Sequence, residues 1–202
     1  MSVLIFIDAA EGQVKKSSLE AMTYGSKIAE QLGVAAEGVV LGNVTVDIAA
    51  LGKYGVKKMH QVSNDALKHL DAQVYANVIA QVAQASGATV VVFSNSMDGK
   101  AISPRLSARM KAGLVAGAVA LPDTSNGFTV KKSVFSGKAF ANISVATPVK
   151  IISLSPNAYK TEAGEGTAEV VAFSATVDAP KVKVTSVNKA SGEVSLTEAE
   201  IV

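Results

Sequence analysis

The residues with the clearest potential for chemistry gather in one polar segment, residues 94–110. Glycine, lysine and serine at the start of a helix could bind an anion, because the first backbone N–H groups of a helix have no partner within it. Two arginines one turn apart could instead contact a partner protein. The alternative is a well-capped helix whose arginines face solvent, and the spacing alone favours it. The candidate partner or anion contacts are Gly99, Lys100, Ser103, Arg105 and Arg109.

One carboxylate and two histidines are the other candidates. Asp8 follows the apolar run Val3–Ile7, which is typical of a buried strand. The carboxyl ends of strands border the ligand crevice of α/β sheets, so Asp8 could be a functional acid, although the position equally suits a turn residue. His60 and His69 lie nine residues apart with no carboxylate at ligand spacing. We expect them to be surface or partly buried histidines rather than metal ligands.

The composition excludes several classes of protein. The 202 residues include no Cys, which excludes a disulfide scaffold, thiolate metal sites, iron–sulfur clusters and a cysteine nucleophile. A net charge of +2 is too small to argue for nucleic-acid or membrane binding. Walker A, Gly-x-Gly-x-x-Gly and Gly-x-Ser-x-Gly sequences are all missing after the predicted strands. We therefore predict no catalytic residue and no metal ligand.

Strands and helices alternate over the first 121 residues, which predicts βαβ units and a parallel sheet with helices on both faces. Ser17 or Ser18 is expected to cap the first helix, and Ser103 the last, with Pro104 in its first turn. The predicted strands are 3–7, 37–41, 57–62, 88–93 and 118–121, and the predicted helices are 19–32, 46–51, 71–86 and 99–110.

The pattern changes after Pro122. Residues 128–135 and 138–145 alternate around Ser136-Gly137, which predicts a β-hairpin. The rest of the chain is expected to form a strand at 149–154, a loop at 157–166, extended segments at 170–173 and 181–187, and a helical turn at 197–200.

Several motifs, taken in order, resemble the alpha subunits of electron-transfer flavoproteins. The sequence Gly99-Lys-Ala-Ile-Ser-Pro-Arg-Leu-Ser-Ala-Arg-Met110 is similar to a family block with Gly, a basic residue and Pro-Arg at this spacing. Similar blocks are Val134-Phe-Ser-Gly-Lys-Ala-Phe140, Ile151-Ile-Ser-Leu-Ser-Pro156 and Leu196-Thr-Glu-Ala-Glu-Ile-Val202. The chain departs from the family at Lys131-Lys132-Ser133, where Arg-Pro is usual, and at Ser155, where an Arg often stands.

The resemblance implies an adenine-nucleotide-hydrolase-like, Rossmann-like α/β domain over residues 1–196, with an added β-hairpin and C-terminal strands. It also implies that residues 197–202 begin the linker or first strand of an FAD-binding domain. The chain is then expected to be an N-terminal fragment that lacks this domain, with FAD bound in the full-length protein and no cofactor-binding residue here.

The function that the resemblance implies is a scaffold and subunit interface, not an enzyme. The full-length protein would pair with a beta subunit and carry electrons from dehydrogenases, such as the acyl-CoA dehydrogenases of fatty acid β-oxidation, to a quinone oxidoreductase. Neither nucleic acid nor membrane insertion is expected, and the absence of a leader sequence predicts a bacterial cytoplasmic protein. The alternative is a stand-alone adenine-nucleotide-binding module of the universal-stress type, with adenosine and phosphate held by Asp8 and residues 94–103.

Overall fold

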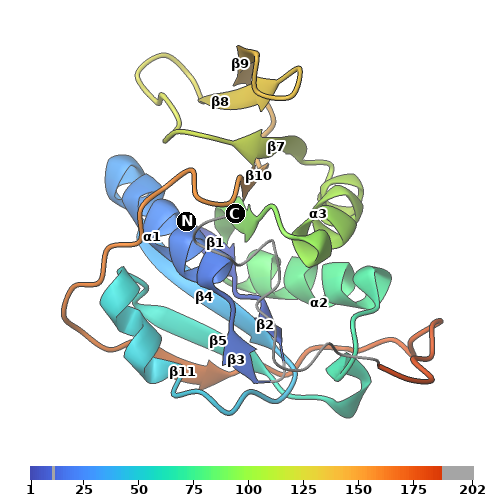
Figure 1. Ribbon diagram of the computed structural model, residues 1–202. Helices are drawn as coiled ribbons and strands as arrows, with labels where there is room; N and C mark the ends of the chain where they lie inside the picture. Colours follow the sequence, from blue (N-terminus) through green and yellow to red (C-terminus); the bar gives the residue numbers. More distant parts are fainter. Residues whose placement is uncertain (11, 188–202) are drawn as a thin grey trace, which may run out of the picture.

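A nine-stranded sheet forms the centre of the computed structural model, which describes residues 1–10 and 12–187 (Figure 1). The strand order is β11-β5-β4-β1-β6-β10-β7-β8-β9. Pairing is parallel from β11 to β7 and antiparallel from β7 to β9. The strands of this sheet are β1 Ser2–Phe6, β4 Ala35–Leu41, β5 Lys58–Val62, β6 Ala88–Ser94, β7 Gly113–Ala118, β8 Thr129–Val134, β9 Ala139–Ser144, β10 Lys150–Leu154 and β11 Glu169–Ala172.

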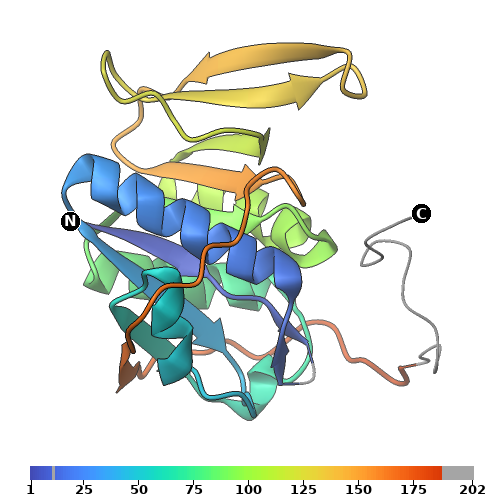
Figure 2. The same ribbon diagram turned by 60° about the vertical axis from the view of Figure 1, so that its left-hand side comes forward.

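Helices cover the two faces of the sheet, as predicted. Helix α1 (Lys16–Leu32) lies on one face, and α2 (Ala72–Ala85) and α3 (Met97–Met110) lie on the other (Figures 1 and 2). Successive residues of β1 point to opposite faces, so that Val3 and Ile5 join the core under α1 while Leu4 joins the core under α2 and α3. Because both faces are buried, the central strands are continuously apolar. The shorter elements are β2 Ala9–Ala10, β3 Gln13–Val14 and the 3₁₀ helices η1 Ala49–Tyr54 and η2 Asp65–Leu67.

The predicted hairpin is confirmed, and it extends the sheet beyond the helices. Strands β8 and β9 pair antiparallel from Thr129↔Ser144 to Val134↔Ala139, with Gly137 at positive φ in the turn (Figure 2). The strands at 149–154 and 170–173 are confirmed as β10 and β11. The α/β, Rossmann-like fold with an added hairpin and C-terminal strands is therefore the one that the sequence predicted.

Two local predictions had the wrong bounds. The strand expected at 118–121 is β7, which ends at Ala118; its small residues weaken the apolar pattern, and a Cβ on Gly113 would lie 2.5 Å from Cγ1 of Val145. The helix expected at 46–51 is the 3₁₀ helix η1, which begins three residues later, at Ala49. The segment 181–187, which was expected to be extended, pairs with no strand, and Val182 and Val187 are exposed.

The C-terminal half of the chain wraps around the helices. After β10, the backbone N–H of Asn157 donates to Oε2 of the buried Glu20 on α1 (2.8 Å). Beyond β11, the segment 173–181 lies along α2, where Gln81 exchanges two hydrogen bonds with the backbone of Thr176 and the N–H of Lys181 donates to Asp71 (3.0 Å). The predicted helical turn at 197–200 and the domain boundary at 196/197 lie outside the described residues. No helix in the described part of the chain is long and apolar enough to cross a membrane.

Candidate functional site

The ends of β1 and β6 form the point at which the strand order changes direction. Strand β1 pairs with β4 on one side and with β6 on the other, and the chain visits β4 first. Open α/β sheets bind ligands in the crevice beyond the carboxyl ends of such strands. Asp8 follows β1, and Ser96 and Asp98 follow β6. The topology therefore brings polar residues together that are about ninety positions apart in the sequence.

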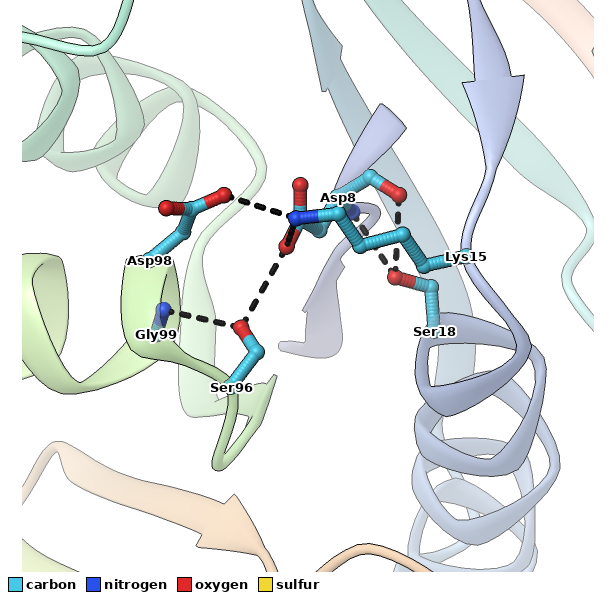
Figure 3. A network of polar contacts seen from close by, with 6 residues as sticks. All are labelled: Asp8, Lys15, Ser18, Ser96, Asp98 and Gly99. Carbon is cyan, nitrogen blue, oxygen red and sulfur yellow. Dashed lines mark hydrogen bonds and ion pairs between the residues drawn. The ribbon is translucent and has the colours of Figure 1, made fainter. Parts of the chain in front are cut away.

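A lysine joins the two carboxylates across this crevice (Figure 3). The Nζ of Lys15 donates to Oδ2 of Asp8 (2.8 Å) and to Oδ2 of Asp98 (2.9 Å). The hydroxyl of Ser96 also donates to Oδ2 of Asp8 (3.3 Å). Two negative charges thus share one positive charge, and the network is held by three separate segments of the chain.

The position of Lys15 depends on the short hairpin of β2 and β3, which turns the chain back toward β1. Gly12 lies in its turn at φ +78, and a Cβ there would approach Oγ1 of Thr45 to 2.6 Å. The hydroxyl of Ser18 accepts from the N–H of Asp8 (2.9 Å) and donates to its carbonyl (3.2 Å). Ser18 therefore holds Asp8 in place instead of capping α1, whose N-cap is Lys15. The predicted Ser17 or Ser18 cap was wrong for this reason.

Burial and charge act in opposite directions on the two ionisable groups. Burial raises the pKa of Asp8, and the nearby Asp98 raises it further, while Lys15 lowers it without cancelling the shift. Burial by itself lowers the pKa of Lys15, but its hydrogen bonds and charge contacts with both carboxylates outweigh burial and raise it. The network therefore holds Lys15 firmly protonated and leaves Asp8 easier to protonate than a free aspartate.

The start of α3 differs from the prediction. The helix begins at Met97, and the Oγ of Ser96 accepts from the N–H of Gly99 (3.1 Å) as its cap. Ser103 is buried in the middle of the helix and does not cap it. Pro104 also lies inside the helix rather than in its first turn. The helix starts earlier because a Cβ on Gly99 would lie 1.9 Å from the carbonyl oxygen of Ser94, so only glycine permits the tight turn from β6 into α3.

The five predicted contact residues do not form one site. Gly99 belongs to the crevice through its bond to Ser96, whereas Ser103 is buried and Lys100 is exposed. Arg105 and Arg109 do lie together, as their spacing predicted. Both line a hollow of about 540 Å³ between α2 and α3, and an Nη of Arg105 donates to the carbonyl of Ala101 (2.6 Å).

Sequence reasoning identified Asp8, and its adenine-nucleotide alternative placed Asp8 together with residues 94–103, a range that includes Ser96 and Asp98. It missed Lys15. All four residues follow predicted strands or lie in the loop after the first one, and parallel strands end at one edge of the sheet. Lys15 carries no such pattern, because the β2–β3 ladder of two residue pairs places it.

Of the two histidines, only His60 is buried. Nε2 of His60 on β5 lies 2.5 Å from Oε2 of Glu37 on β4, and its ring packs edge-on against Phe173. His69 is exposed. In the described part of the chain, no three His, Asp or Glu side chains are placed to hold a metal ion.

Comparison with known proteins assigns the family. The family model described as "Electron transfer flavoprotein domain" matches residues 3–178. The electron transfer flavoprotein subunit alpha of Bacillus subtilis is 28% identical over 205 residues, which cover 99% of this chain and 62% of the relative. The corresponding subunit of Clostridium acetobutylicum is 29% identical over 144 residues, 70% of this chain and 43% of the relative. The lactate dehydrogenase (NAD(+),ferredoxin) subunit LctC of Acetobacterium woodii is 27% identical over 143 residues, 70% of this chain and 34% of the relative.

The chain spans less than two thirds of the length of each of these curated relatives. The alpha-subunit resemblance predicted from the motifs is confirmed by both kinds of comparison. Since the family model matches residues 3–178, the chain belongs to the electron transfer flavoprotein domain family.

Proposed function

We propose that this chain is the N-terminal scaffold and subunit-interface domain of an electron transfer flavoprotein alpha subunit. The observation that carries the proposal is the match to the Bacillus subtilis alpha subunit over 99% of this chain. In the full-length bacterial cytoplasmic protein, FAD would carry electrons from dehydrogenases, such as acyl-CoA dehydrogenases, to a quinone oxidoreductase. The chain itself would form the structural framework of an electron-carrier subunit and would not be an enzyme.

The crevice network supports a structural role for this domain. The ammonium group of Lys15 binds the carboxylates of both Asp8 and Asp98. These contacts tie the segments that follow β1 and β6 to the β2–β3 hairpin. The first turn of α3 also carries the Asp98 carboxylate, which disfavours a phosphate at this helix start. That charge argues against the alternative of a stand-alone adenine-nucleotide module with its phosphate at residues 94–103.

The β8–β9 hairpin is the surface best suited to bind a beta subunit. Strand β9 is the edge of the sheet, and Phe140 and Ile143 on it are 60% and 37% exposed. Phe135 at the turn is 79% exposed, and the Nζ of Lys131 lies 4.3 Å from the centre of the Phe140 ring. Exposed edge strands and exposed apolar side chains favour pairing with another chain. We propose that the partner covers this hairpin.

Co-expression with the beta subunit of the same organism tests the proposal. Size-exclusion chromatography with light scattering should show a one-to-one complex for the unchanged chain. The double substitution Phe140→Ser, Ile143→Ser should abolish it, since it removes the apolar surface of the edge strand. Val170→Ser, on the opposite edge strand β11 and also partly exposed, is the matched control and should leave the complex intact. Failure of the unchanged chain to form a complex would refute the interface role.

The Arg105 and Arg109 pair forms a second proposed contact. The two side chains are exposed beside a hollow between α2 and α3, and their positive charges suit a partner surface that carries carboxylates. In the full-length protein, Arg105→Ala with Arg109→Ala should weaken heterodimer assembly or electron transfer. Lys160→Ala removes an exposed positive charge elsewhere and should have no effect. Unchanged assembly and electron transfer in the double arginine variant would show that this face docks nothing.

A further inference from the structure

An asparagine or aspartate followed directly by glycine occurs twice in the sequence, at Asp98-Gly99 and at Asn126-Gly127. In such a pair, the backbone nitrogen of the glycine can attack the side-chain carbonyl carbon of the residue before it. Glycine permits this attack because it has no Cβ to shield its nitrogen and restricts the backbone least. The fold decides whether the attack can take place, through the freedom of that nitrogen and its exposure to water.

The loop between β7 and β8 leaves Asn126 and Gly127 open to this reaction. Both residues are exposed. Within residues 1–10 and 12–187, the side-chain amide of Asn126 and the backbone N–H of Gly127 make no hydrogen bond. A Cβ built on Gly127 would meet no atom within 4 Å. The described fold therefore offers no contact that opposes the rotation bringing the Gly127 nitrogen to Cγ of Asn126.

The two ends of this loop are fixed, so a change at its tip leaves the core contacts in place. Asp123 and Thr129 exchange two backbone hydrogen bonds (2.8 and 2.9 Å), which close the loop. The Phe128 ring is buried directly after the tip. The loop lies at the end of the β8–β9 hairpin opposite to the 135–138 turn (Figure 2). Asn126 thus belongs to an exposed loop on a rigid base.

The fold holds the other pair, at the start of α3, against the same reaction. The N–H of Gly99 donates to Oγ of Ser96 (3.1 Å), and Gly99 is buried. A Cβ on Gly99 would collide with the carbonyl oxygen of Ser94, so this turn has no room to rearrange. The Asp98 carboxylate is bound to Nζ of Lys15 (2.9 Å). Two pairs of similar sequence therefore have opposite environments.

We propose that Asn126 is a site of spontaneous deamidation and isoaspartate formation. The Gly127 nitrogen forms a bond to Cγ of Asn126 and gives its proton to the solvent. The bond between Cγ and Nδ2 breaks, and the amide group takes up a proton and leaves as ammonia. Water then opens the resulting succinimide at one of its two carbonyl carbons, which yields aspartate or isoaspartate. The sum converts an amide and a water molecule into a carboxylate and an ammonium ion, and it needs no oxidant or cofactor.

Either product changes the loop in a defined way. A second carboxylate joins Asp123 in the same loop, and the net charge of the chain falls by one unit from +2. Isoaspartate also inserts its side-chain methylene into the backbone between the two fixed ends. Because Phe128 remains in the core, we expect the modified chain to keep its fold. The inference does not depend on the interface role proposed above.

Peptide mapping by mass spectrometry tests the inference on the unchanged chain, after incubation in mildly alkaline buffer at physiological temperature. Asn126 should convert to a mixture of aspartate and isoaspartate. Asn157 is the internal control, since it is also exposed but the N–H of the following Ala158 is bound to the carbonyl of Ser155 (3.2 Å). It should react at least about tenfold more slowly. Equal rates at Asn126 and Asn157 overturn the proposal.

Incubation in urea separates the contribution of the fold from that of the sequence. Isoaspartate at Asp98 should form at least about tenfold more slowly in the folded chain than in urea, because only unfolding releases the N–H of Gly99. The rate at Asn126 should change by less than about threefold between the two conditions. A folded chain that protects Asn126 as strongly as Asp98 contradicts the assignment.

The substitution Asn126→Gln gives a separate arm. Glutamine keeps the amide group but would have to close a larger, less favourable ring, so the acidic species that accumulates on ion exchange should be reduced at least about tenfold. Asn142→Gln, which changes an exposed asparagine on β9, is the matched control and should leave that species unchanged. An undiminished acidic species in folded Asn126→Gln shows that the modification lies elsewhere and refutes the proposal.

Discussion

Lys15→Met is the sharpest perturbation of the crevice network. Methionine keeps much of the apolar stem of lysine but removes the ammonium group that binds Asp8 and Asp98 at 2.8 and 2.9 Å. The Asp8 side chain is only 7% exposed, so its carboxylate cannot recover the lost contact from water. Breaking a fully buried pair costs about 3–5 kcal/mol. Because Lys15 and Asp98 are 27% and 31% exposed, we expect a smaller loss of about 2–3 kcal/mol at pH 7.

The pH dependence of this loss follows from the two pKa shifts. The folded-state pKa of Asp8 lies above its usual 3.8, so the folded protein binds this proton more tightly than the unfolded chain and the ionised carboxylate costs stability above that pKa. Lys15 offsets that cost. The difference in the free energy of unfolding between the unchanged chain and Lys15→Met should therefore be largest at neutral pH and become smaller as acid protonates Asp8. Toward high pH, it should persist past 10.5, because the folded-state pKa of Lys15 is raised.

Urea unfolding followed by far-UV circular dichroism measures the loss, since the chain has no Trp for fluorescence. The melting temperature should fall by about 4–10 °C. Lys27→Met, which removes an exposed lysine paired with the exposed Glu30, should leave stability nearly unchanged. Adding Asp8→Asn to Lys15→Met should recover part of the loss, because no unpaired carboxylate is then buried. A loss below about 0.5 kcal/mol, or the same loss at pH 7 and in acid, would refute the reasoning.

Two further substitutions test the local geometry. Gly99→Ala should destabilise the chain by about 2 kcal/mol or more in urea unfolding, because its Cβ would meet the Ser94 carbonyl at 1.9 Å; Gly164→Ala, whose nearest neighbour lies at 3.7 Å, should be almost neutral. Asp71→Ala should cost about 1–2 kcal/mol at pH 7, since Asp71 caps α2 and holds Lys181. Burial alone raises the Asp71 pKa, but backbone hydrogen bonds outweigh it and lower the value below 3.8, so this loss should vanish only as the pH falls through that lowered pKa.

The sequence predicted the layered fold because each central strand carries its own pattern. Runs such as Val3–Ile7 are β-branched and apolar on both sides, and Gly33 and Gly87, both at positive φ, end the helices where expected. The hairpin was predictable for the same reason, since Ser136-Gly137 interrupts two alternating stretches. These elements are specified by neighbours within a few residues.

The elements that were missed depend on distant neighbours. Ser96 and Ser103 are equally good caps by local pattern, and only the contact between Gly99 and the carbonyl of Ser94 decides between them. Gln81 on α2 is polar and would be expected to face water, yet it forms a double hydrogen bond with Thr176 in the segment that crosses the helix. Side-chain type therefore predicts the outer face of α2 but not the segment that covers it.

In the crevice, the sequence predicts the position of Asp8, whereas tertiary structure places the charged groups around it. Asp8 was identified because strand ends border a crevice in any parallel sheet, and that rule needs no knowledge of the partner. Its ionisation and its fixed position require Lys15, which reaches it through a two-residue β ladder, and Asp98, which reaches it because β6 neighbours β1. A carboxylate at a strand end therefore predicts where a site lies, whereas the charges that meet it there decide whether an anion can bind. Here the second carboxylate, in the first turn of α3, disfavours an anion.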